Sequence, residues 1–139
     1  MTAKEYLNQY CLARRELKCL QEEIQELEAL AEYVSPHPTA GGSSGVSDKV
    51  GNTAAKIADK RSSLERSVGE ALELLNEIQS RIAQLKDERH RWILRERYVH
   101  CRKWEHIARS GYYSLRTVLY QNQRALAAFE DRFPEIRAL

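Results

Sequence analysis

The chain has 139 residues, of which 30% are charged, and it contains only six glycines and three prolines. Few helix breakers together with many Leu, Ala, Glu and Arg residues favour long helices over a sheet. No run approaches the ~20 apolar residues that cross a bilayer, and no charged-then-apolar leader opens the chain. We therefore expect a soluble, all-helical, cytoplasmic protein of ordinary domain size.

The net charge of +2 hides an uneven distribution along the chain. Residues 1–34 carry four Lys or Arg against seven Asp or Glu, and residues 48–88 carry seven against eight. Residues 89–139 carry eleven against five. Such an excess of positive charge at one end predicts a polyanionic partner for the C-terminal third.

The three cysteines are Cys11, Cys19 and Cys101. An odd number without the spacing of a disulfide framework, in a helical chain, predicts reduced thiols in a cytoplasm. Cys11 and Cys19 lie eight residues apart on a predicted helix, too far to bond to each other.

The first predicted helix covers residues 2–34. Thr2 and Glu5 have the spacing of a capping box, in which each side chain bonds the backbone N–H of the other residue. Pro36 and Pro38 end the helix. Its apolar positions alternate in steps of four and three, which is a heptad seam: Tyr6, Tyr10, Ala13, Leu17, Leu20, Ile24, Leu27, Ala31 and Val34.

The uncharged residues 35–47 read as a flexible loop, with Ser47 or Asp48 as the cap of a second helix from about residue 50 to 88 or beyond. Two amphipathic helices joined by a loop predict an antiparallel, coiled-coil-like hairpin over residues 1–88. Because such a hairpin exposes much of its seam, we expect it to form a homodimer or higher homo-oligomer, or to pack on another element. A purely structural coiled coil is the alternative. The second seam contains Ala54, Ile57, Arg61, Leu64, Val68, Ala71, Leu75, Ile78, Ile82, Leu85, Arg89 and Trp92.

After residue 88 the period changes and the predicted helices become short. Apolar clusters around Trp92, Trp104 and Val118 mark three helices, with Gly111 breaking the chain and Ser114 as an N-cap. Three short helices with a tight turn before the last one predict a helix-turn-helix module over residues 89–133, followed by a tail, 134–139.

The last helix, residues 114–129, is the expected recognition helix in the major groove of double-stranded DNA. Arginines suit guanine, an amide suits adenine, and apolar or hydroxyl groups suit thymine methyls and phosphates. The candidate residues on this helix are Ser114, Leu115, Arg116, Thr117, Tyr120, Gln121 and Arg124. Phosphate contacts are expected from basic residues on the supporting elements: Arg91, Arg95, Arg97, Arg102, Lys103 and Arg109. A solvated basic face without a ligand is the alternative interpretation.

The segments LRERYV (94–99) and WEHIA (104–108), with Ser114, Val118 and RAL (124–126), resemble the region-four helix-turn-helix of bacterial sigma factors. With SDKVG (47–51), the chain is similar to sigma-like phage proteins of Gram-positive prophages, related to late transcriptional regulators of the ArpU/RinA type. This resemblance implies a phage-encoded transcriptional regulator in the bacterial cytoplasm.

By position, the resemblance makes Ser114 the recognition-helix cap. It implies a groove-facing set of Leu115, Arg116, Thr117, Leu119 and Tyr120, and a scaffold of Ile107, Ala108, Val118 and Leu126. The chain departs from the pattern at Gly111-Tyr112, where Leu-Gly is usual, at Lys103 in place of a Ser/Thr cap, and at Gln121 in place of an apolar residue.

Other chemistries find little support in the sequence. His100, Cys101 and His106 lack the spacing and the fourth ligand of a zinc site. No phosphate-binding glycine loop, catalytic triad or carboxylate pair occurs, so we expect no enzyme activity, metal or cofactor. The alternative function is a packaging or assembly factor resembling small terminase subunits, or a protein that binds host RNA polymerase through the same module.

Overall fold

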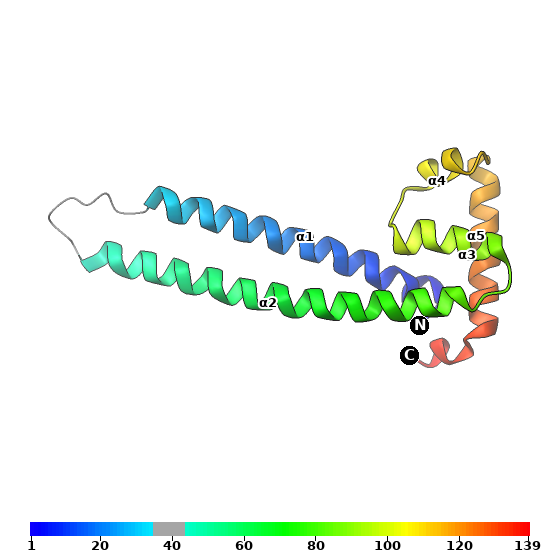
Figure 1. Cartoon of the computed structure of the whole chain (residues 1–139), viewed down its shortest axis with the longest axis horizontal. Helices are drawn as coiled ribbons and strands as arrows, with labels where there is room; N and C mark the ends of the chain where they lie inside the picture. The colour runs from blue at the N-terminus through cyan, green and yellow to red at the C-terminus, as the bar shows by residue number, and fades with distance from the viewer. Residues whose placement is uncertain (35–43) are drawn as a thin grey trace. The chain divides into compact units, whose positions relative to one another are not determined.

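The computed structural model describes residues 1–34 and 44–139, and over these residues the fold is all-α, as predicted: helices are joined by turns and loops, and no strand occurs. Two long helices come first and three shorter ones follow (Figure 1). The elements in chain order are α1 (Ala3–Val34), α2 (Ser44–Ala83), α3 (Glu88–Leu94), the π-helical turn η1 (Arg95–Val99), α4 (Trp104–Ser110), α5 (Leu115–Arg132) and the 3-10 helix η2 (Pro134–Ala138).

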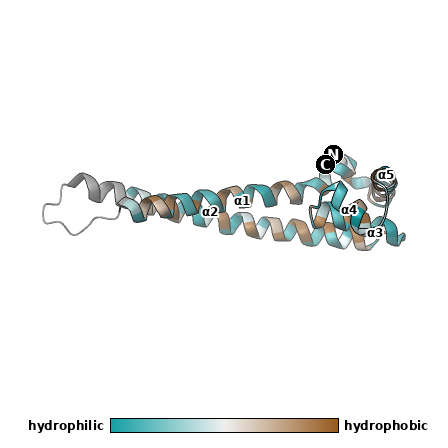
Figure 2. Cartoon of the chain, turned by 90° about the horizontal axis from the view of Figure 1, so that it is seen from above, coloured by the Kyte–Doolittle hydropathy of each residue, from teal (hydrophilic) through white to brown (hydrophobic). Residues whose placement is uncertain are grey.

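The predicted antiparallel hairpin is confirmed, since α1 and α2 run in opposite directions beside each other (Figure 1). Hydrophobic residues recur along both helices (Figure 2). The seam predicted for α1 is also confirmed, because its positions from Tyr6 to Ala31 are buried or half-buried.

The seam predicted for α2 is confirmed at its C-terminal end, where Leu75 is half-buried and Ile82 and Leu85 are buried, but it is wrong at three positions nearer the start of the helix. Ile57, Leu64, Ala71 and Ile78 face inward as expected, but before Ala71 the other inward positions are one residue earlier than predicted. The half-buried residues there are Thr53, Lys60 and Ser67, whereas Ala54, Arg61 and Val68 are exposed. Long polar side chains such as Lys60 can lay their methylene groups along a seam, which a purely apolar pattern does not anticipate.

The boundaries of the second helix also differ from the prediction. Helix α2 begins at Ser44, so residues 44–47 are helical and neither Ser47 nor Asp48 is its cap. Residues 35–43 of the predicted loop lie outside the described residues. The helix ends at Ala83 and not at 88. Asp87 lies in the connection that follows, where it accepts a hydrogen bond from the backbone N–H of Arg89, 2.8 Å away, and so caps α3.

The chain divides into two compact units, and each long helix contributes to both. The second unit, Arg15–Glu70, contains only hairpin residues. Ile24 is its buried centre, and Lys60 forms an ion pair with Glu23 at 2.8 Å. Arg61 pairs with Glu28 at the surface. Because both pairs are largely exposed to solvent, they contribute little to the stability of the unit.

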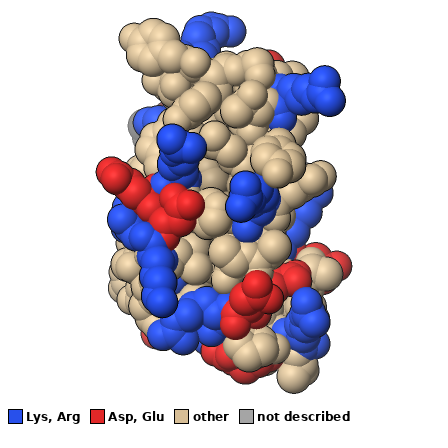
Figure 3. Space-filling view, turned by 90° about the vertical axis from the view of Figure 1, so that its right-hand side faces the viewer, with Lys and Arg blue, Asp and Glu red and all other residues tan. Residues whose placement is uncertain are grey.

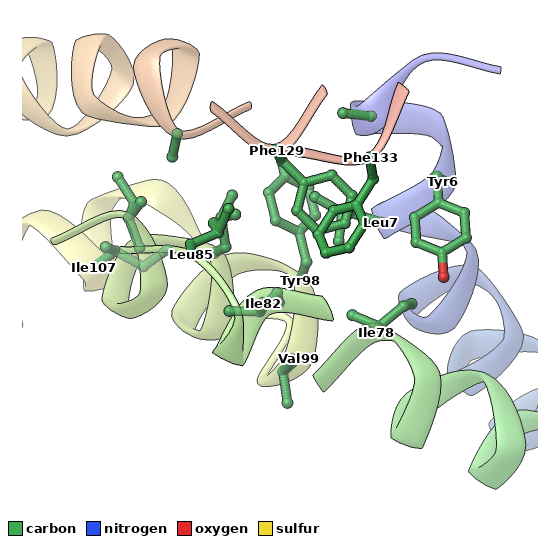
Figure 4. Packing of buried hydrophobic residues seen from close by; sticks show 14 of the residues in the cluster. Tyr6, Leu7, Ile78, Ile82, Leu85, Tyr98, Val99, Ile107, Phe129 and Phe133 are labelled. Atoms are coloured by element: carbon green, nitrogen blue, oxygen red, sulfur yellow. The ribbon is translucent and has the colours of Figure 1, made fainter. Parts of the chain in front are cut away.

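The first unit combines Met1–Arg14 with Ala71–Leu139 and holds the main hydrophobic core. The start of α1 therefore groups with the C-terminal helices, unlike the division at residue 88 suggested by the sequence. Tyr6 and Leu7 on α1 lie among residues of α2, η1 and α5 (Figure 4). The ring of Tyr6 stacks on that of Phe129 with 6.0 Å between centroids. Burial raises the pKa of the Tyr6 phenol.

The first turn of α1 is capped from two directions. The predicted capping box is present, since Thr2 N–H donates to Glu5 and Glu5 N–H donates to Thr2 Oγ1. In addition, Ala3 N–H donates to Glu130 on α5, at 3.1 Å. These backbone hydrogen bonds lower the pKa of both carboxyl groups, and Arg137 lowers that of Glu130 further.

The structure corrects two predictions about the first unit, one on its cysteines and one on residues 134–139. Cys11 and Cys101 form a disulfide, with Cα atoms 5.8 Å apart, whereas the sequence suggested three reduced thiols. Periodicity within one helix gives no information on a residue 90 positions away. The tail, 134–139, is largely the 3-10 helix η2, and its Ile136 is fully buried. The third cysteine, Cys19, is free and exposed.

In the described ranges no helix is long and apolar enough to span a membrane.

Reduction of the Cys11–Cys101 disulfide should destabilise the first unit. The bond closes a loop with a sequence separation of 90, so its loss should lower the free energy of unfolding by about 2–4 kcal/mol. Urea denaturation of C101S and of the dithiothreitol-treated protein measures this, with C19S as a control that should match the wild type. Three reactive thiols in the unreduced, denatured protein would contradict the bond.

The Glu130 contact should contribute a stability that is lost in acid. Because the folded-state pKa is below the usual value, the contribution is complete above about pH 5 and disappears as the pH falls through the lowered pKa. The Tm of E130Q should therefore be lower than that of the wild type at pH 7, and the gap should close towards pH 3. Thermal melts across this range test it, with the exposed Glu135→Gln as control; a constant gap would contradict it.

Candidate nucleic-acid interface

The C-terminal helices are held by a support that runs from α3 directly into η1. Ile93 and Leu94 at the end of α3 are fully buried. In η1 the Tyr98 hydroxyl donates to Oδ1 of the buried Asn122 on α5, at 3.2 Å, so a polar pair inside the core joins the two elements. Burial raises the pKa of Tyr98, which keeps its hydroxyl a donor.

Helix α4 packs on this support and on α5 through its inner face. Ile107 and Ala108 are buried, as predicted, and belong to the same core as Val118. The N-cap Lys103 makes no side-chain hydrogen bond to the helix, so the departure seen in the sequence is a real loss of a cap. Packing alone therefore fixes the start of α4.

The turn between α4 and α5 is closed by backbone hydrogen bonds. Tyr113 N–H donates to Ala108 O at 2.9 Å, and Tyr112 N–H donates to Arg109 O at 3.3 Å. These are the two bonds of a Schellman motif, which ends a helix with one residue in the left-handed region. That residue is Tyr112, with φ of 58°.

Gly111 precedes this residue and allows a close approach to α3. A Cβ atom built on Gly111 would lie 2.6 Å from Cη2 of Trp92 and 2.8 Å from Cδ2 of Tyr113. The rings of Trp92 and Tyr113 pack against each other at 6.1 Å. The glycine is therefore required for packing, and its own φ is an ordinary −91°.

Helix α5 begins as the sequence predicted. The Ser114 Oγ accepts from Thr117 N–H at 3.2 Å, and the two hydroxyls lie 2.8 Å apart. The inner face of α5 consists of Val118, Asn122, Ala125 and Phe129, all buried. The helix continues to Arg132, three residues beyond the predicted end.

Four of the predicted residues lie on the outer face of α5. Leu115 and Tyr120 are 42% and 59% exposed, and Arg116 and Arg124 are exposed beside them. The guanidinium of Arg124 lies 5.9 Å from the centre of the Tyr120 ring. These side chains share one surface and are free to contact a ligand.

Three other predicted residues are half-buried or use their side chains within the protein. Ser114 is exposed, but its hydroxyl caps the helix. Thr117 is half-buried and its hydroxyl contacts that of Ser114. Gln121 is half-buried, and its Oε1 is enclosed without a hydrogen-bond partner among the described residues. The structure thus separates these three from the outer set.

Sequence reasoning missed Gln123, which is exposed on the outer face of α5. It lies seven residues after Arg116, two helical turns further along the same face. The helical period assigns it to the outer face once Val118 and Ala125 are known to face inward. Leu119, taken only from the family resemblance, is 40% exposed.

The basic residues of the supporting elements divide into two groups. Arg91 donates to Lys86 O at 2.9 Å, while Arg97 donates to Arg102 O and lies 4.5 Å from the centre of the Trp104 ring, so both are structural. Arg102 is exposed but paired with Glu96. The remaining residues are exposed and have no ion pair within the described ranges: Arg95, Lys103 and Arg109.

The charge around the turn and the first half of α5 has one sign. Between Glu105 and Glu130 the sequence contains three arginines and no Asp or Glu. On the face viewed in Figure 3, Lys and Arg lie among uncharged residues in the upper part, and acidic residues lie at the left at mid-height and at the lower right. An outer helix face with arginine, glutamine and tyrosine side chains and no acidic group suits a polyanion.

No known protein family matches the chain, and searches of curated proteins and of solved structures also gave no match. Among the described residues, no cluster of His, Cys, Asp and Glu is arranged to hold a metal ion.

Replacing Gly111 with alanine should disturb the turn. The new Cβ would overlap the Trp92 ring, so the variant should lose about 1–3 kcal/mol of folding free energy. Gly69, inside α2, offers a matched control, because a Cβ atom added there meets nothing within 4 Å. G69A should gain about 0.5–1 kcal/mol. Urea denaturation of both variants tests the contrast, and equal stability of the two would contradict it.

Proposed function

We propose that the chain binds double-stranded DNA through α4, the following turn and α5, with the first half of α5 in the major groove. The observation that carries this proposal is the outer face of α5, where Arg116, Gln123 and Arg124 are exposed and no acidic residue lies nearby in the sequence. Arginine and glutamine are the side chains that read guanine and adenine through paired hydrogen bonds.

The separation of the helices supports this role. Helices α4 and α5 are joined by a tight turn rather than merged into one rod, and α5 is capped independently by Ser114. This is the plan in which the second helix of a pair enters a groove while the elements before it meet the phosphates. Arg95, Lys103 and Arg109, all exposed, are proposed as phosphate contacts.

The resemblance to region four of sigma factors supports a further step in the proposal. DNA binding by such a module would serve transcriptional regulation, in a protein of phage origin. The competing proposal, a protein partner such as RNA polymerase, draws on the exposure of Leu115 and Leu119, which are 42% and 40% accessible. The absence of Asp and Glu between Glu105 and Glu130 favours DNA as the first partner to test.

The proposal is tested by selecting bound duplexes from a random-sequence pool and measuring affinity by fluorescence anisotropy. R116A should weaken binding to the enriched duplex by about 1–3 kcal/mol and binding to a shuffled duplex very little. R66A removes the same charge from an exposed position on α2 and should leave both affinities unchanged. No enrichment, or an equal loss with both arginine variants, would contradict the proposal.

A further inference from the structure

Tyr112 is an unusual residue for its place in the turn. It follows Gly111, the C-cap of α4, in a Schellman motif, and has a φ of 58°. Glycine usually takes this position, and asparagine sometimes does, because a Cβ atom is unfavourable in the left-handed region. A bulky aromatic residue there is a true outlier.

The neighbouring glycine does not relieve this conformation. Gly111 has a φ of −91°, which any residue can adopt. A glycine is needed there because a Cβ atom would lie 2.6 Å from the ring of Trp92. The turn therefore uses its glycine for packing and leaves the left-handed position to Tyr112.

The side chain of Tyr112 makes no contact with the described residues that would offset the cost of this backbone conformation. It is 97% exposed and makes no hydrogen bond, ion pair or ring contact over the described ranges. Cys101 is the other non-glycine residue with positive φ among them, at 56°, and its side chain is committed to the disulfide with Cys11. Strain at an exposed residue that stabilises nothing points to a role outside the chain.

The surroundings of Tyr112 indicate the kind of partner. Arg109 precedes it by three residues and Arg116 follows by four, and both are exposed. The acid-free segment between Glu105 and Glu130 surrounds all three. An exposed phenol close in sequence to two exposed arginines, in a segment without acidic residues, is suited to a phosphate group, and tyrosine is among the side chains that contact phosphates in DNA complexes.

We propose that Tyr112 is a DNA-backbone contact whose hydroxyl donates a hydrogen bond to a phosphate oxygen beside the groove that α5 occupies. This inference rests on the proposed DNA-binding function and adds to it a residue at which stability is given up for affinity. Because a phosphate contact is independent of sequence, any duplex reports it.

The experiment measures the affinity of the full chain for a mixed-sequence 30-base-pair duplex at low salt, and its Tm. Y112F removes only the hydroxyl and should weaken binding about threefold to tenfold at unchanged Tm. Y112G should weaken binding at least as much while raising Tm by about 2–4 °C, since glycine relieves the strain. Y33F, at a tyrosine that is 89% exposed on α1, should change neither quantity.

The possible results separate this inference from the proposed function. Wild-type affinity in Y112F would overturn the inference and leave DNA binding intact, so that a protein partner would become the better explanation of the exposed ring. A Tm of Y112G at or below that of the wild type would also overturn it, because the strain would be absent. If the wild type does not bind the duplex, both proposals fail.

Discussion

The contact between Gly111 and the ring of Trp92 is the constraint on which the C-terminal module depends. It brings the end of α4 against α3 more closely than any residue with a side chain would permit. Tyr112 then turns the chain in the left-handed conformation, and Ser114 starts α5. Beyond this turn, α5 buries the face that carries Val118.

The core that receives this inner face extends well beyond the module. Tyr6 at the start of α1 stacks on Phe129, and the amide of Ala3 is capped by Glu130. The Cys11–Cys101 disulfide joins the same regions covalently. The first turns of α1 are therefore part of the support for α5. The inner face of α5 packs in this core, and its outer face is exposed.

Much of this arrangement followed from periodicity and caps. The hairpin, the separate short helices and the Ser114 cap were all predicted, because each depends on residues close together in the sequence. The partner of Cys101, the burial of Ile136 and the place of Lys60 in the α2 seam were not, since each depends on packing between distant segments or on a long polar side chain. At the candidate interface, the helical period separates exposed Arg116 and Gln123 from half-buried Gln121 only once the inner face is known.

The most direct test of the central claim is the mapping of backbone amide chemical shifts by NMR as a mixed-sequence DNA duplex is added. If the outer face of α5 is the binding surface, shifts should concentrate in residues 109–124 and in the loop before α4, and residues 15–33 of α1 should remain unaffected. Shifts confined to the hairpin, or none at all at saturating DNA, would contradict the account.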